Sequence, residues 1–223
     1  TLPGYKRTLE RILSLEPPPE HISAYSLILE EGTPLFGRYE KGELDIPDED
    51  TDREMYQMTK EILAERGYRR YEISNYAREG YECRHNCGYW RRRSYAGFGL
   101  GAASLVDNVR FRNGSDLPAY LADSLGCRED VRHLSRGEQM EEFMFLGLRM
   151  TDGVDMWEFE RLFGCGMEEV YGDVIEKNIR DGLLKADFYI AAGEDSEPAQ
   201  AARRLALTER GLDLSNYVMA QFL

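Results

Sequence analysis

The densest group of side chains able to do chemistry lies between Glu82 and Ser104, in the stretch ECRHNCGYWRRRSYAGFGLGAAS. Within it stand one histidine, two cysteines, an adjacent tyrosine and tryptophan, and three consecutive arginines. An imidazole can bind iron, aromatic rings can lie against a flat ligand, and guanidinium groups can pair with carboxylates. The stretch therefore has the groups needed to bind a flat, acidic ligand that carries a metal.

His85 is the candidate metal ligand, because a neutral imidazole is a common axial ligand of haem iron. Tyr89 and Trp90 are placed to lie against the face of a tetrapyrrole. The propionates of such a ligand would pair with the basic run Arg91, Arg92 and Arg93. Two other interpretations remain open from the residue types alone, namely a hydrogen-bonded loop histidine and a solvated basic turn.

Two thiols flank this histidine, Cys83 and Cys87. An iron–sulfur motif of the form C-x-x-x-C-x-x-C needs a third cysteine three positions after Cys87, and Trp90 occupies that position. Two thiolates alone complete neither a tetrahedral zinc site nor a cluster. We therefore expect free cysteines and no iron–sulfur ligands in this chain.

Three glycines alternate in the same stretch, Gly97, Gly99 and Gly101. In a strand they would fall on one face and leave it without side chains, so that a flat ligand or another backbone could approach closely. A tightly packed or bent barrel strand is the alternative.

Two other rows of polar residues have the spacing of a strand face. One row is His21, Ser23 and Tyr25, and the other is Glu72, Ser74 and Tyr76. On adjacent strands they would line a barrel interior, close to the place where barrel enzymes have their sites. An internal layer of hydrogen bonds is an equally good interpretation.

Composition excludes several classes of protein. The 223 residues carry a net charge of −13, which argues against a nucleic-acid partner. No apolar run approaches the roughly 20 residues needed to span a bilayer, so we expect no transmembrane segment. The four cysteines are irregularly spaced in a long chain, which favours a reduced compartment and a cytoplasmic location over a disulfide scaffold.

The first half of the chain reads as alternating helices and strands. Residues 1–4 resemble the tail of a strand, and residues 5–15 have helical spacing that ends at three prolines. We expect a strand buried on both faces at 21–29, followed by a loop at 30–50. A helix should then be capped by Thr51 with Glu54 and end at Gly67, and a second strand should follow at 71–77. This order predicts parallel βα units.

The second half reads as a separate module. After a short strand at 109–112 and an irregular connection at 117–132, Ser135 and Glu138 form a capping box that opens a helix through Met150. Helices are expected at 155–163 and 167–180, the latter with Val170 inside, and a hairpin at 183–190 and 203–207 with a loop at 193–198. A last helix should run from Thr208. This arrangement resembles a winged helix.

Several segments together resemble the oxygen-independent coproporphyrinogen III oxidase-like family of radical-SAM proteins, and the resemblance extends over almost the whole chain. They are HISAYSLILEEGTP, YEISNYA, YAGFGLGAAS and LTERGLDLSNYVMAQFL. The haem-chaperone branch of this family is distinguished by the motif H-N-x-x-Y-W, here His85, Asn86, Tyr89 and Trp90. The resemblance therefore implies a haem-binding chaperone that transfers haem to respiratory-chain client proteins. The alternative is an oxygen-independent coproporphyrinogen III oxidase.

The resemblance also implies an α/β fold, with part of a (βα)6 partial TIM barrel in residues 1–116, a connection in 117–132, and a winged-helix-like α+β domain in 133–223. It implies a 4Fe–4S cluster and S-adenosylmethionine (SAM) in the intact proteins, with Ile28 and Ala103 at positions that lie by SAM. Haem would be bound through His85. The sequence departs from the family pattern in lacking the cluster motif and the N-terminal half-barrel, and in a longer loop around residues 187–202.

Overall fold

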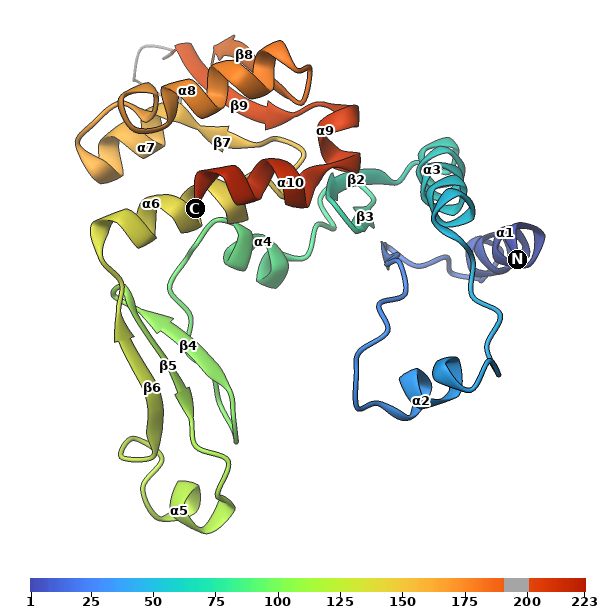
Figure 1. Cartoon of the computed structure of the whole chain (residues 1–223), viewed down its shortest axis with the longest axis horizontal. Coiled ribbons are helices and arrows are strands. Elements are labelled where there is room, and N and C mark those ends of the chain that lie inside the picture. The colour runs from blue at the N-terminus through green and yellow to red at the C-terminus, as the bar shows by residue number, and fades with distance from the viewer. Residues whose placement is uncertain (191–200) are drawn as a thin grey trace. The chain divides into compact units, whose positions relative to one another are not determined.

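The computed structural model describes residues 1–190 and 201–223. The chain folds into two compact units, Thr1–Cys83 and Arg84–Leu223. Figure 1 shows both units. The expected domain boundary at 117–132 does not coincide with this division, because that segment pairs with strands inside the second unit.

Unit 1 packs helices on one side of a small antiparallel sheet whose strand order is β1-β3-β2. Its elements are α1 (Leu2–Leu13), β1 (His21–Ser23), α2 (Pro34–Glu40), α3 (Glu49–Glu65), β2 (Arg69–Glu72) and β3 (Asn75–Ala77). Helix α1 packs against α3. The buried core consists of Ile22, Leu63, Tyr68 and Tyr76.

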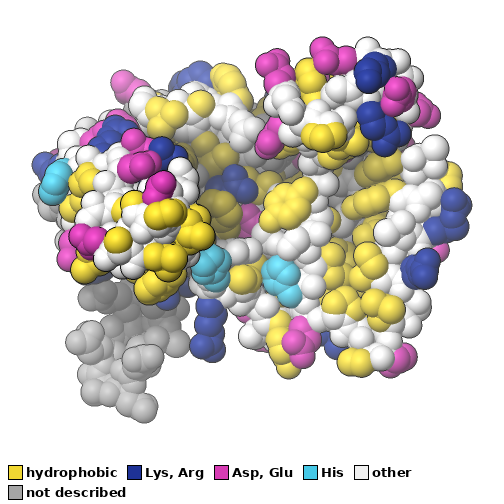
Figure 2. Space-filling view, turned by 90° about the horizontal axis from the view of Figure 1, so that it is seen from below, with side chains coloured by type: hydrophobic (Ala, Val, Ile, Leu, Met, Phe, Trp, Pro, Cys, Tyr) yellow, Lys and Arg dark blue, Asp and Glu magenta, His cyan; other side chains and the backbone are white. Residues whose placement is uncertain are grey.

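The parallel sheet predicted for this unit is wrong. The expected strand at 71–77 folds instead as a β2–β3 hairpin, in which the Glu72 side chain accepts a hydrogen bond from the backbone N–H of Ser74 (2.7 Å). Because β3 turns back at this point, β1 loses its neighbour after Ser23 and the expected strand at 21–29 is short. The apolar residues that follow are exposed rather than buried, with Tyr25 at 68% and Ile28 at 78%. Hydrophobic side chains at the molecular surface are yellow in Figure 2.

Both helix starts in unit 1 differ from the prediction. Helix α1 begins at Leu2, because a proline is well tolerated in the first turn of a helix, where its missing N–H is not needed. Helix α3 begins at Glu49, and the cap is Asp48, whose carboxylate accepts a hydrogen bond from the backbone N–H of Thr51 (2.8 Å). Hydrogen bonding by Thr51, first through its side chain and then through its backbone N–H, lowers the pKa of Asp48. The expected loop at 30–50 contains α2, which Thr33 caps.

Unit 2 begins with α4 and a three-stranded arm. The elements are α4 (Arg84–Trp90), β4 (Ala103–Val106), β5 (Val109–Asn113), α5 (Leu117–Ala122) and β6 (Arg128–His133). The strands are antiparallel in the order β4-β5-β6, and Figure 1 shows them extending from the helical part with α5 at the tip. The strand predicted at 109–112 is confirmed. The segment 117–132, expected to be irregular, holds α5 and most of β6.

The helical part of unit 2 surrounds a sheet of order β7-β9-β8. Its elements are α6 (Arg136–Gly147), β7 (Val154–Asp155), α7 (Met156–Phe163), α8 (Met167–Arg180), β8 (Leu184–Ile190), β9 (Ala201–Leu207), α9 (Glu209–Asp213), α10 (Ser215–Met219) and the 3₁₀ helix Ala220–Phe222. The capping box of Ser135 and Glu138, the bounds of α7 and α8, and the β8–β9 hairpin confirm the prediction.

Three details of this part differ or fall outside the structure. The last helix is broken into α9, α10 and the 3₁₀ turn. Val170, expected inside, is 44% exposed. The loop predicted at 193–198 and most of the long loop at 187–202 lie outside the described residues. In the described ranges, no helix is both long and apolar enough to cross a membrane.

Aromatic rings form the centre of this helical part. Phe159 on α7 is fully buried, and its ring centroid lies 4.7 Å from that of Phe163, 5.5 Å from that of Phe143 and 6.2 Å from that of Tyr171. Burial raises the pKa of Tyr171 to about 12, so the phenol remains neutral in this core. Helix α6 contributes Phe143 to the cluster and also contacts α4, so the core is connected to the helix that carries His85.

Candidate functional site

His85 lies on a helix, so it is not the loop histidine that the residue types alone had left open. It is in the first turn of α4, and its side chain is exposed. Residues four apart lie on the same face of a helix, so the ring of Tyr89 packs edge-on against the imidazole with centroids 4.6 Å apart. Tyr95 packs edge-on against Tyr89 in turn, at 4.5 Å. The three side chains form a row of rings that ends in an exposed imidazole.

The end of α4 explains how Tyr95 reaches this row. The backbone N–H of Arg93 donates to the carbonyl of Gly88 (2.9 Å), and Arg92 has a φ of 52°, in the left-handed region that often ends helices. The chain therefore reverses. Tyr95 then exchanges two backbone hydrogen bonds with Leu105 of β4 (2.8 and 3.0 Å).

Arg92 is held inside unit 2. Its Nε donates to Glu142 Oε2 (2.9 Å) and its Nη2 donates to Asn108 Oδ1 (2.8 Å). The side chains of Arg92 and Glu142 are only 12% and 8% exposed. Of the three arginines predicted to meet propionates, Arg92 is thus committed to protein partners, whereas Arg91 and Arg93 are exposed.

Glu142 also binds a second guanidinium. Arg110 Nη1 on β5 lies 2.9 Å from Glu142 Oε1, and the Arg110 side chain is 41% exposed. Burial raises the pKa of Tyr95, while the positive charge of Arg110 opposes that rise. The sequence prediction missed Tyr95, Arg110 and Glu142. Tyr95 stands within the same dense stretch, but nothing along the chain links the other two to it.

Trp90 faces a different part of unit 2. The guanidinium carbon of Arg149 lies 4.2 Å from the centroid of its ring, a cation–π contact. Trp90 and Arg91 line a pocket of about 60 Å³ together with Phe143 and Val154. Pockets for drug-sized ligands measure about 300–1,000 Å³, so this pocket does not hold a macrocycle. Trp90 therefore fastens α4 to the α6–β7 region.

The three glycines lie in a turn before β4 and not in a strand. Gly99 and Gly101 have positive φ angles of 96° and 65°. A Cβ on Gly97 would lie 2.3 Å from the backbone oxygen of Ala103. Gly97 therefore allows another stretch of backbone to approach closely, which was one of the two uses expected, whereas Gly99 and Gly101 supply the positive φ angles of the turn. Asn113 Nδ2 ties the turn together through the carbonyl oxygens of Gly97 (3.2 Å) and Gly99 (2.8 Å).

The remaining predicted residues are spread over both units. Asn86 is half-buried on α4, between Cys83, which precedes the helix, and Cys87, and both cysteines are free of disulfides. Within the described ranges no group of three or more His, Cys, Asp or Glu side chains is arranged to hold a metal. The residues present do not fit an iron–sulfur cluster. Ile28 belongs to unit 1 and Ala103 to unit 2, so their shared role in binding SAM stays a prediction.

The polar rows on the strands of unit 1 form an internal hydrogen-bond layer. Ser23 Oγ donates to Asn75 Oδ1 (2.5 Å), and Asn75 Nδ2 donates to Glu72 Oε1 (2.6 Å), with Asn75 and Glu72 both fully buried. His21 Nε2 lies 2.9 Å from the hydroxyl of Tyr71. Tyr76, which was expected on the same face as Glu72, packs instead in the core with Ile22.

His21 gives this unit a testable pH dependence. Burial lowers the pKa of His21, and the nearby charge of Glu72 only partly opposes it. The unfolded chain therefore binds more protons than the folded one just below the ordinary histidine pKa of about 6.5, so stability falls as the pH drops through that value. We expect His21→Gln to flatten the dependence of the urea midpoint on pH between about 7 and 5. Parallel curves for the two proteins would contradict this expectation.

Comparison with known proteins gives consistent matches. Residues 134–190 match the family model described as the HemN C-terminal domain. Over its whole length the chain is 36% identical to "Heme chaperone HemW" of Lactococcus lactis subsp. lactis and 33% identical to that of Bacillus subtilis. It spans 55% of the length of both relatives. Among solved structures, coproporphyrinogen III oxidase (HemN) from Escherichia coli superposes with a TM-score of 0.69 at 17% identity, covering 100% of this chain and 51% of that one.

Proposed function

We propose that this chain, which is 36% and 33% identical over its whole length to two proteins named "Heme chaperone HemW", binds haem and serves as part of a haem chaperone. One observation carries the proposal. The motif H-N-x-x-Y-W forms a helix that leaves the imidazole of His85 exposed at the end of a row of aromatic rings. An accessible imidazole fits an axial ligand of haem iron.

The side chains of unit 2 take different roles in this proposal. His85 binds the iron, Tyr89 supports the imidazole, and the exposed Arg91 and Arg93 meet propionates. Trp90 and Arg92 hold α4 in place, since they contact α6 or the residues beside it, and Asn86 stays a predicted haem-binding residue. The iron supplies the ligand-binding and redox chemistry of the cargo, and the protein supplies its attachment.

The rest of the family pattern belongs to the same proposal. A 4Fe–4S cluster and SAM would serve the intact protein, with Ile28 and Ala103 near SAM, but no cysteine set in this sequence fits the cluster. Respiratory-chain proteins would receive the haem, in the cytoplasm. Residues 133–223 would be a winged-helix-like domain, which the order α6-β7-α7-α8-β8-β9 supports, and residues 1–116 the part of a (βα)6 barrel that the resemblance implies.

A haemin titration tests the proposal. We expect a shifted Soret band on binding, and we expect His85→Ala to lose that shift and bind haemin about ten-fold more weakly or worse, since even partners of metal ligands are worth about 10–100-fold in affinity. His133→Ala is the matched control, because His133 is also exposed in unit 2 but lies on β6. A Soret band unchanged in the His85 variant would remove His85 from the iron.

A second candidate function is oxidative decarboxylation of coproporphyrinogen III. The structural similarity to coproporphyrinogen III oxidase favours it. The H-N-x-x-Y-W motif favours the chaperone instead, and both functions require an acidic tetrapyrrole. Turnover of coproporphyrinogen by the cluster-loaded full-length protein would establish the enzyme, whereas haemin binding without turnover supports the chaperone.

A further inference from the structure

Strand register places a basic residue of the arm on the same face as the ring row. Tyr95 pairs with Leu105, and Leu105 pairs directly with Arg110 across β4 and β5. Residues directly opposite each other in antiparallel strands present their side chains on the same face. Tyr95, Leu105 and Arg110 therefore form a line across three adjacent segments. Leu105, the middle member of this line, is buried, while the Arg110 side chain is 41% exposed.

The His85 face of α4 and the Trp90 face point in different directions. With 3.6 residues per turn, Tyr89 is turned by about 40° from His85, whereas Trp90 is turned by about 100° from Tyr89. Trp90 and Arg91 line the small pocket beside α6 and β7. A macrocycle bound through His85 therefore extends along Tyr89 and Tyr95 and not toward the ring of Trp90.

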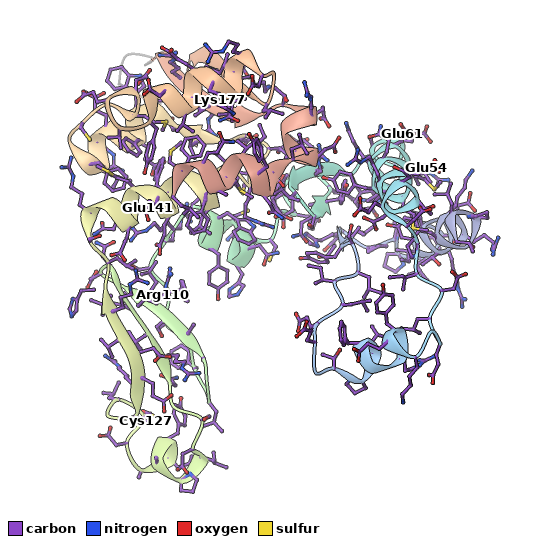
Figure 3. All side chains as sticks on the ribbon, in the orientation of Figure 1. Glu54, Glu61, Arg110, Cys127, Glu141 and Lys177 are labelled. Atoms are coloured by element: carbon purple, nitrogen blue, oxygen red, sulfur yellow. The ribbon has the colours of Figure 1, made fainter. Side chains whose placement is uncertain are left out.

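Arg110 is the first cation of the arm along this row; Arg132 of β6 lies opposite it and pairs with Glu138. Arg110 stands at the end of the arm that joins the helical part of unit 2, as Figure 3 shows. Its charge acts on the Tyr95 hydroxyl. Glu142 holds one of its terminal nitrogens (2.9 Å), which leaves other donors of the planar guanidinium for a ligand.

We propose that Arg110 binds a carboxylate of the tetrapyrrole whose iron is bound by His85, and that Glu142 is the positioning residue that aims Arg110. This inference rests on the proposed function, and it assigns the acidic edge of the ligand to β5 of the arm. The pairing is charge-assisted and fits a propionate, because the guanidinium fork can hold both carboxylate oxygens.

The experiment compares two probes, haemin and haem dimethyl ester, in which the propionates carry no charge. A hydrogen bond to a charged group is worth about 1.5–3 kcal/mol, or at least about ten-fold in affinity. We expect esterification to weaken binding to the unaltered protein by at least about ten-fold. In Arg110→Gln, the preference for haemin over the ester should fall by about ten-fold, to the part that Arg91 and Arg93 supply, and the ester should bind as it does to the unaltered protein.

Arg112→Gln is the matched control. Arg112 lies two residues further along β5 and is 52% exposed, but it pairs with Glu129 and Asp130 of β6. It should retain the preference for haemin over the ester. Arg110→Lys keeps the charge beside Glu142 and should recover part of the preference, which separates loss of the ligand contact from loss of the fold.

The outcomes distinguish the two levels of the proposal. If His85→Ala leaves the Soret band of bound haemin unchanged, the proposed function fails. If binding depends on His85 but Arg110→Gln keeps the full preference for haemin over the ester, or weakens both probes equally, then Arg110 does not bind the carboxylate and this inference alone is overturned.

Discussion

Phe159→Ala is expected to lower the free energy of unfolding by about 3–5 kcal/mol, the usual cost of removing a buried phenylalanine ring. Phe159 has no exposed surface, and its ring is in contact with those of Phe143, Phe163 and Tyr171. Deleting it leaves a cavity between α6, α7 and α8 and also removes three edge-on or tilted ring contacts. Urea unfolding followed by circular dichroism measures the effect.

Trp157→Ala on the same helix is the matched control for this change. Trp157 is also aromatic and lies two residues earlier on α7, but it is 57% exposed. Exposed positions away from special contacts usually change stability by less than about 0.5 kcal/mol. A Phe159→Ala protein as stable as Trp157→Ala would mean that the aromatic cluster does not hold unit 2 together.

The helical part of unit 2 was the most predictable part of the fold, because local chemistry marks its helix ends. Ser135 and Glu138 exchange hydrogen bonds within one turn, and Asp155 accepts hydrogen bonds from the first backbone N–H groups of α7. Gly164 adopts the left-handed conformation that ends α7. Each of these contacts joins residues fewer than five positions apart, so the sequence alone shows them.

The sheets were predicted less well, because strand pairing depends on distant segments. The segment YEISNYA contains neither glycine nor proline, so it resembles one strand. The turn is made instead by the buried side chain of Glu72, which accepts the backbone N–H of Ser74. The strand β6 was not predicted, for a different reason. Its side chains are all exposed, so no alternating pattern of hydrophobic residues marks it as a strand.

In the candidate site, too, residues close in the sequence were predictable and residues from distant segments were not. His85 and Tyr89 could be named from the sequence, because they stand in one short stretch dense in side chains able to bind a tetrapyrrole. Arg110 and Glu142 belong to β5 and α6, and only the tertiary fold brings them to the end of α4. From the sequence alone, a glutamate in a helix is expected to face solvent. The burial of Glu142 can be understood only when its two guanidinium partners are known.

Glu142→Ala tests the part of the site that the sequence did not show. Glu142 is the shared carboxylate of Arg92 and Arg110, at 2.9 Å from each. Removing it leaves the guanidinium of Arg92, 12% exposed, without its carboxylate, and breaking a buried pair on one side costs about 3–5 kcal/mol. Because Arg110 is 41% exposed and can turn toward water, we expect a loss near the low end, about 3 kcal/mol, in urea unfolding.

The neighbouring carboxylate provides the control, since Glu141→Ala removes the same charge from the next position of α6, as labelled in Figure 3. A loss equal to that of Glu142→Ala would assign the effect to net charge and not to the shared ion pair. The double variant Glu142→Ala with Arg92→Ala also removes the guanidinium that Glu142→Ala leaves without a partner carboxylate. Its loss of unfolding free energy should therefore be smaller than the summed losses of the two single variants, by about 0.5–3 kcal/mol. Strict additivity would show that Arg92 draws no stability from Glu142. In that case the left-handed end of α4, and with it the direction in which His85 faces, would depend on Asn108 and the Trp90 contact instead.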